Sequence, residues 1–362
     1  MDNTTSNLLN VSTLYYEPAA LQYKRGQEIF DKYKHYAELI EVPGHWKIDS
    51  LNQNPDLIRN WNQVKSHYLV LGVKSAIQSR PNGRSTDWIA PSHASGCAMA
   101  CSYCYVARRK GYANPITVFA NIEKILNHIK RKCAKLGTKV ITQDNFQTDP
   151  HLWTWDIGEN NDASVDDLVS PNVRDLIELF ASLPNAKASF ATKYVNRNLL
   201  NYDPKGHTRV RFSLMPAHVA RIIDVRTSPI GDRIAAINDF VEAGYEVHIN
   251  LSPVVIYPGW QQDYIQLFMQ LDDELNLAAK EQLKAEIIFL THNEDLHELN
   301  LKWHPKGEEQ YLWRYPEMQQ RKLSQNGMVN LRYKNNIKGP AVEEIRNLIS
   351  EHLPYCVVRY AF

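Results

Sequence analysis

The sequence predicts an α/β fold, a partial (β/α)6 barrel with helical additions at both ends. Its length of 362 residues suits either two domains or one large barrel. From residue 87 onward, short β-branched or apolar segments alternate with longer amphipathic segments. Such alternation favours a parallel sheet, because each helical crossover returns the chain to the same edge. The composition, with 44% apolar and 22% charged residues, is that of a globular chain.

The elements divide into three regions. Residues 1–85 are expected to form a mostly helical extension, with a helix over 20–40 and a short strand over 68–73. Residues 86–295 form the barrel core, and residues 296–362 form a C-terminal extension whose last strand, 354–362, closes the barrel. The expected barrel strands are 87–90, 139–143, 188–192, 209–214, 246–251 and 286–291. Helices are expected over 117–135, 171–182, 229–243, 261–275 and 341–351.

Composition and charge exclude several classes of protein. No apolar run reaches the 18 residues of a membrane span, and the polar first residues lack the basic segment of a secretory signal. We therefore expect a cytoplasmic protein with no membrane partner. With 41 Lys and Arg against 40 Asp and Glu, the net charge is +1. This balance predicts no attraction of the whole protein to nucleic acid, and it is compatible with a local basic groove.

The cysteines carry the strongest signal. Cys97, Cys101 and Cys104 are crowded together, whereas Cys133 and Cys356 are isolated. An odd count without an export signal indicates a reducing compartment, and three thiols so close in sequence resemble ligands of one metal centre. Two interpretations compete. One is a zinc site completed by His93, and the other is a 4Fe–4S cluster that leaves one iron open to a small molecule.

The segment SGCAMACSYCY, residues 95–105, resembles the C-x3-C-x-aromatic-C motif of the radical S-adenosylmethionine (radical SAM) superfamily. The resemblance implies that Cys97, Cys101 and Cys104 bind the cluster and that SAM chelates the open iron. It further implies reductive cleavage of SAM to a 5′-deoxyadenosyl radical, which takes a hydrogen atom from the substrate. Tyr103 matches the superfamily's aromatic residue near the adenine.

Residues 87–259 resemble the spore photoproduct lyase family more closely. The matching segments are Cys104-Tyr105, Thr192-Lys193, RVRFS at 209–213, GYEVHINLSPVVIYPGW at 244–260 and Arg332-Tyr333-Lys334. The resemblance implies a lyase acting on a thymine photoproduct in DNA, with an external electron donor such as flavodoxin or ferredoxin. It places Lys193 and Ser213 on SAM, and makes Tyr105 and Tyr333 catalytic candidates. Asn145 and Asp149 follow the expected second strand, where radical SAM proteins contact the methionyl amine; a polar loop is the competing interpretation.

The match fails at one place. The family carries a hydrogen-donating cysteine after its second strand, but residues 142–154 contain none. Tyr105 is an alternative donor. Two other functions stay open, a radical SAM enzyme acting on a substrate other than nucleic acid and a non-enzymatic zinc-binding module. The candidates for a DNA groove are the basic residues Arg108, Arg109, Lys110, Arg197, Lys205, Arg209, Arg211 and Arg332, together with the aromatic residues Trp153, Trp155, Trp260, Trp313 and Tyr315.

Overall fold

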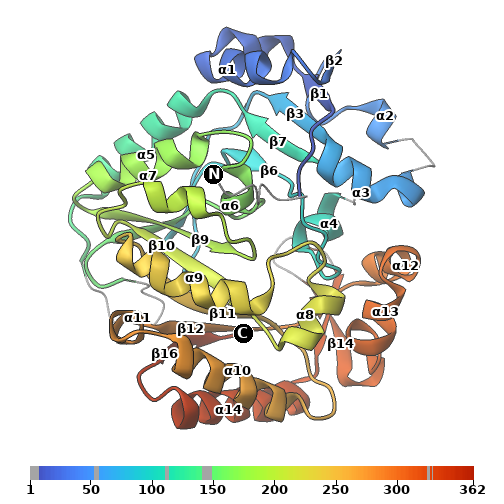
Figure 1. Ribbon diagram of the computed structural model, residues 1–362, viewed down its shortest axis with the longest axis vertical. Coiled ribbons are helices and arrows are strands. Elements are labelled where there is room, and N and C mark those ends of the chain that lie inside the picture. The colour runs from blue at the N-terminus through green and yellow to red at the C-terminus, as the bar shows by residue number, and fades with distance from the viewer. Residues whose placement is uncertain (1–7, 53–56, 111–113, 141–148, 324–326, 328) are drawn as a thin grey trace. The chain divides into compact units, whose positions relative to one another are not determined.

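The computed structural model describes residues 8–52, 57–110, 114–140, 149–323, 327 and 329–362 (Figure 1). The chain forms two compact units. The first comprises residues 1–100, 110–190 and 196–208, and the second comprises residues 101–109, 191–195 and 209–362.

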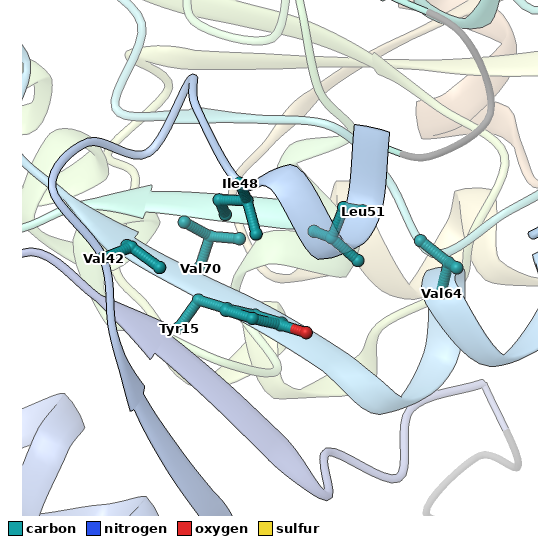
Figure 2. Packing of buried hydrophobic residues seen from close by; sticks show 6 residues of the cluster. All are labelled: Tyr15, Val42, Ile48, Leu51, Val64 and Val70. Atoms are coloured by element: carbon teal, nitrogen blue, oxygen red, sulfur yellow. The ribbon is translucent and has the colours of Figure 1, made fainter. Parts of the chain in front are cut away.

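An N-terminal sheet lies in the first unit. Its order is β2-β1-β3-β7-β6, with parallel pairing except between β6 and β7. The strands are β1 (Thr13–Tyr16), β2 (Glu38–Glu41), β3 (Tyr68–Gly72), β6 (Ala94–Ser95) and β7 (Ile116–Phe119). Apolar side chains from these strands and the segments around them form a buried cluster (Figure 2). Its members are Tyr15, Val42, Ile48, Leu51, Val64 and Val70.

The first 85 residues therefore contain strands as well as the expected helices. The helices are η1 (Pro18–Gln22), α1 (Lys24–Tyr33), α2 (Asp49–Asn52) and α3 (Leu57–His67). The helix expected over 20–40 ends at Tyr33, because residues 38–41 pair with β1 as strand β2. The strand expected at 68–73 is confirmed as β3.

Four further strands of the first unit belong to the barrel sheet. They are β4 (Arg80–Pro81), β5 (Trp88–Ile89), β8 (Trp153–Asp156) and β9 (Ala186–Thr192). Strand β8 pairs in parallel with both β5 and β9, and β4 pairs antiparallel with β5. The first and third expected strands are thus confirmed as β5 and β9.

The second barrel strand was expected in the wrong place. Residues 139 and 140 are not in a strand, and 141–143 lie outside the described residues. Strand β8 occupies the position instead. Its Trp155 is fully buried and stacks on Trp88 of β5, with ring centroids 5.9 Å apart. Packing across the sheet, rather than local β-branching, selects this segment.

The helices of the first unit follow the expected apolar spacing. They are α5 (Ile122–Leu136), α6 (Ala163–Asp166), α7 (Asn172–Ser182) and η2 (Arg197–Asn201). Helix α5 buries Ile122, Ile125, Ile129 and Cys133, which share one helical face. The helix expected over 117–135 is α5, which begins at Ile122 because residues 116–119 form strand β7. Helix α7 confirms the helix expected at 171–182.

A further run of parallel strands lies in the second unit. Its strands, in order of pairing, are β10 (Thr208–Leu214), β11 (Glu246–Val254), β12 (Lys284–Phe289) and β16 (Val357–Ala361). One face packs against helix α9 (Ile230–Glu242), where Phe212 contacts Phe240 at 5.2 Å between ring centroids. The three expected strands and the C-terminal strand are confirmed.

The remaining elements of the second unit are mostly helical. They are α4 (Tyr105–Lys110), α8 (Ala217–Ile223), α10 (Trp260–Glu274), α11 (Leu277–Gln282), α12 (Glu294–Trp303), α13 (Pro305–Gly307), η3 (Glu308–Leu312), η4 (Pro316–Met318) and α14 (Asn335–His352). Strands β13 (Thr291–His292), β15 (Val329–Tyr333) and β14 (Gln319–Leu323) form a small antiparallel sheet. Among the described helices, none has the length and hydropathy needed to cross a membrane.

Candidate active site

The three cysteines of the motif form no disulfide bond with one another or with another described residue. Cys97 belongs to the first unit, and Cys101 and Cys104 belong to the second. The Met99 amide donates to Cys97 Sγ at 3.4 Å, and the Ala107 amide donates to Cys104 Sγ at 3.5 Å. Hydrogen bonds from backbone amides to the ligand sulfurs are characteristic of iron–sulfur clusters. The donor set therefore fits a cluster.

Backbone contacts fix Cys97 within the first unit. Buried Lys65 donates from Nζ to the Cys97 carbonyl at 3.0 Å. The preceding Gly96 has φ +90°, and a Cβ there would lie 2.3 Å from the Pro115 carbonyl oxygen. Glycine is thus required where the chain turns into the cysteine motif.

Ser102 anchors the motif within the second unit. Its amide and hydroxyl both donate to the Ile223 carbonyl, at 2.9 and 3.2 Å. Its own carbonyl accepts from Asn300 Nδ2 at 2.6 Å. The backbone between Cys101 and Cys104 is therefore held by the end of α8 and by α12.

Tyr103 is attached to a buried ion pair. Its hydroxyl donates to the Asp224 carboxylate, which pairs with Arg233 at 3.0 Å. Burial, reinforced by Asp224, raises the pKa of Tyr103 well above its ordinary value. The phenol therefore stays protonated and keeps its hydrogen bond.

Arg233 connects this pair to the other expected SAM contacts. It donates to the Ser213 carbonyl at 2.7 Å and to the Ser228 carbonyl at 2.8 Å. The Ser228 amide in turn donates to the Lys193 carbonyl at 3.0 Å, and Lys193 Nζ lies 5.6 Å from the centroid of the Tyr103 ring. The structure thus brings Tyr103, Lys193 and Ser213 together around one buried arginine.

Sequence reasoning missed Asp224 and Arg233. Arg233 lies in α9 beside the buried Ile230, Ile234 and Ile237. A charged residue within the apolar stripe of a helix is a detectable signal, since an isolated buried charge is rare without a partner. The partner itself is visible only in the fold.

Ser213 lies beside an unsatisfied polar atom. It is buried in β10 directly opposite Asn250 of β11. Asn250 Oδ1 is buried and has no hydrogen-bond partner among the described residues. A buried acceptor without a donor is costly, so this atom fits a ligand that supplies an N–H or O–H group.

The structure does not test the two expected contacts to the methionyl amine. Asn145 lies outside the described residues. Asp149 precedes the second barrel strand rather than following it, because that strand is β8. Burial opposes ionisation of Asp149, but Lys187 at 3.0 Å and the amides of His151 and Leu152 outweigh it and lower its pKa. Its contact to SAM stays a prediction.

Placing the second barrel strand at β8 does not supply the family's hydrogen-donating cysteine. The segment that follows β8, residues 157–161, reads IGENN. His93, the expected histidine ligand of the zinc alternative, is buried and directly precedes β6. Its Nε2 lies 3.1 Å from Asn161 Nδ2. Burial lowers the pKa of His93 to about 4.

The two candidate catalytic tyrosines differ in exposure. Tyr105 is 39% exposed at the start of α4, with the Arg108 guanidinium 5.4 Å from its ring centroid. Tyr333 is buried, and its hydroxyl accepts from the Ile256 amide at 2.9 Å. Burial raises the pKa of Tyr333. Tyr105 is thus accessible, whereas Tyr333 is packed against the segment after β11, and its catalytic role stays a prediction.

Several residues expected along a DNA groove are core residues. Arg209 and Arg211 are buried and pair with Glu246 at 2.8 Å and Glu286 at 3.0 Å. Trp155 and Trp260 are buried as well. The prediction that these four side chains line a DNA groove is wrong, because they are buried in ion pairs and in packing.

Comparisons with known proteins show the family of the chain. The family model described as spore photoproduct lyase matches residues 10–362. The spore photoproduct lyase of Bacillus subtilis (strain 168) is 27% identical over 277 residues, covering 76% of this chain and 77% of that protein. The spore photoproduct lyase of Geobacillus sp. (strain Y412MC61) is 26% identical over the same length, with the same coverage.

Solved structures match almost the whole chain. Spore photoproduct lyase complexed with dinucleoside spore photoproduct superposes with a TM-score of 0.87, at 22% identity, over 98% of this chain and 99% of that one. A variant with bound AdoMet (SAM) and the same dinucleoside matches equally well. The agreement confirms the expected α/β partial barrel.

Proposed function

Because this chain belongs to the spore photoproduct lyase family, we propose that it is a radical SAM enzyme that repairs a thymine photoproduct in DNA. The family is one of enzymes, so the non-enzymatic zinc-binding module is excluded as a function. The observation that carries the proposal is the anchored cysteine motif, whose Tyr103 is attached to the Asp224–Arg233 pair.

The cofactors are a 4Fe–4S cluster and SAM. Cys97, Cys101 and Cys104 would hold the cluster, and Tyr103, Lys193 and Ser213 would hold SAM. When bound, the two groups supply the radical chemistry that removes a hydrogen atom from the substrate. The electron comes from an external donor such as flavodoxin or ferredoxin.

The chain's own residues bind and orient the ligand. Arg233 fixes the backbone at Ser213 and, through Ser228, at Lys193. Lys193 supplies a positive charge suited to a carboxylate. Asn250 Oδ1, which lacks a partner among the described residues, accepts a hydrogen bond from the ligand.

Tyr105 would return the hydrogen atom to the repaired base. No cysteine follows the second barrel strand, and Tyr105 combines a phenolic O–H with accessibility. The same missing cysteine favours the second candidate function, a radical SAM enzyme acting on a substrate other than nucleic acid.

Electron paramagnetic resonance of the anaerobically reconstituted, dithionite-reduced protein tests the cofactor assignment. We expect a 4Fe–4S signal that changes when SAM is added. Incubation with dinucleoside spore photoproduct should then release the repaired dinucleoside, measured by liquid chromatography. A SAM-responsive cluster without repair would favour the second function, and absence of any cluster signal would overturn the proposal.

A Tyr105→Phe variant tests the hydrogen donor. Repair turnover should fall by about tenfold or more, while the cluster signal and its response to SAM remain unchanged. In D2O, the wild-type enzyme should place solvent deuterium in the product, and the variant should not. Tyr36→Phe, at an exposed position of the first unit, is the matched control. Unchanged turnover in Tyr105→Phe would remove this role.

A further inference from the structure

We propose that His292, His297 and Glu308 form a second metal site, which binds one divalent transition-metal ion, zinc foremost. The three residues come from β13, α12 and η3 of the second unit. One ligand atom from each lies within 4.8 Å of the other two. Two imidazole nitrogens and one carboxylate oxygen are a donor set that zinc prefers in proteins.

The three groups converge in the interior. His292 and Glu308 are 0% and 1% exposed. His292 Nε2 lies 3.0 and 3.1 Å from the two Glu308 oxygens, and His297 Nδ1 lies 2.7 Å from Oε2. A buried carboxylate requires a cation or several donors, and here two imidazoles aim at the same carboxylate. The partly exposed His297 gives an ion a route to the site.

Neighbouring side chains orient the ligands. Asn300 donates from Nδ2 to Glu308 Oε1 at 2.5 Å. The ring of Trp313 stacks on His297, with centroids 3.8 Å apart and planes 13° from parallel. Metal sites characteristically hold their ligands by such outer contacts. Three protein ligands leave further coordination positions for water.

This site is connected to the cysteine motif without sharing a ligand with it. Asn300 Nδ2 also donates to the Ser102 carbonyl, between Cys101 and Cys104. An ion on Glu308 would therefore stabilise the residue that anchors the motif. The donor set contains no thiol, so the proposal does not depend on the proposed function.

Metal analysis of the purified full-length protein tests the proposal. Elemental mass spectrometry of protein from zinc-supplemented cultures measures zinc separately from cluster iron. We expect about one zinc per chain, retained when all three motif cysteines are changed to alanine. X-ray absorption should show nitrogen and oxygen ligands at about 2.0–2.1 Å and no sulfur at about 2.3 Å.

Ligand variants complete the test. His297→Gln and Glu308→Gln should weaken zinc binding by more than about 100-fold in competition with a chromophoric chelator, exceeding the usual effect of outer contacts. His218→Gln, a histidine of the same unit whose side chain is 42% exposed, should keep the wild-type affinity. Circular dichroism checks folding, and His297→Gln suffices where Glu308→Gln does not fold. Sulfur ligation, absence of zinc, or unchanged affinity in His297→Gln would overturn the site and leave a hydrogen-bonded cluster.

Discussion

Strands β1, β3 and β7 of the N-terminal sheet pair in parallel, as do strands β10, β11 and β12 of the second unit, yet the two sets differ in what they bury. Strands β1, β3 and β7 contain no Asp, Glu, Lys, Arg or His, as is usual for strands covered on both faces. Strands β10, β11 and β12 bury Arg209, Arg211, His248 and Glu286. Buried charges are costly when compared with apolar packing. The contrast indicates that apolar packing holds the first set of strands, whereas buried ion pairs contribute to the second.

The largest effect is expected at the centre of the charged face. Glu286 accepts from Arg211 at 3.0 Å, from Arg359 at 2.7 Å and from the Tyr360 hydroxyl at 3.0 Å. Glu286→Ala should lower the free energy of unfolding by about 3–5 kcal/mol, because two buried guanidinium groups lose their carboxylate. Urea denaturation measures the change. Glu41→Ala, on the exposed edge strand β2, should change it by less than about 0.5 kcal/mol. Equal effects would contradict the importance of the buried charges.

A smaller loss is expected in the apolar sheet. Val70 is buried in the cluster of the N-terminal sheet (Figure 2). Val70→Ala should lower the free energy of unfolding by about 2 kcal/mol, since it removes the two buried methyl groups of the valine and leaves a cavity. Val357→Ala on β16, where the side chain is exposed, should be nearly neutral. Comparable losses in thermal or urea unfolding would show that burial does not separate the two positions.

The smallest effect is a pH dependence specific to the strands of the second unit. Burial lowers the pKa of His248 to about 3, against about 6.5 in the unfolded chain. The unfolded state therefore binds more protons between these values, and stability falls as the pH drops from about 6.5. The slope from this residue should approach about 1.4 kcal/mol per pH unit. His248→Gln should show a shallower loss of stability between pH 7 and 5, and parallel curves would disprove the assignment.

Local sequence patterns predicted most of the fold but not every strand. Strands β9 to β12 were readable because their apolar runs are bounded by clear breaks. The second barrel strand was misplaced, because residues 140–142 have β-branched side chains whereas WTWD at 153–156 follows a polar turn. The stacking of Trp155 on Trp88 decides the outcome, and it joins residues far apart in sequence.

The candidate site divides in the same way. The cysteine motif was predictable because its chemistry depends on local spacing. Asp224 and Arg233 were missed, since their meaning depends on Tyr103, 121 residues away from Asp224. Arg209 and Arg211 were misinterpreted because their acidic partners lie 37 and 75 residues further along the chain.

The anchoring of Ser102 bears on how the protein is made. Its partners Ile223 and Asn300 follow it by 121 and 198 residues, so they leave the ribosome long after the motif itself. Contacts of such sequence separation form late. We expect delivery of iron and sulfide to follow completion of the polypeptide rather than accompany translation. Nascent chains stalled before residue 300 should acquire no cluster from a scaffold protein, whereas released chains should acquire one.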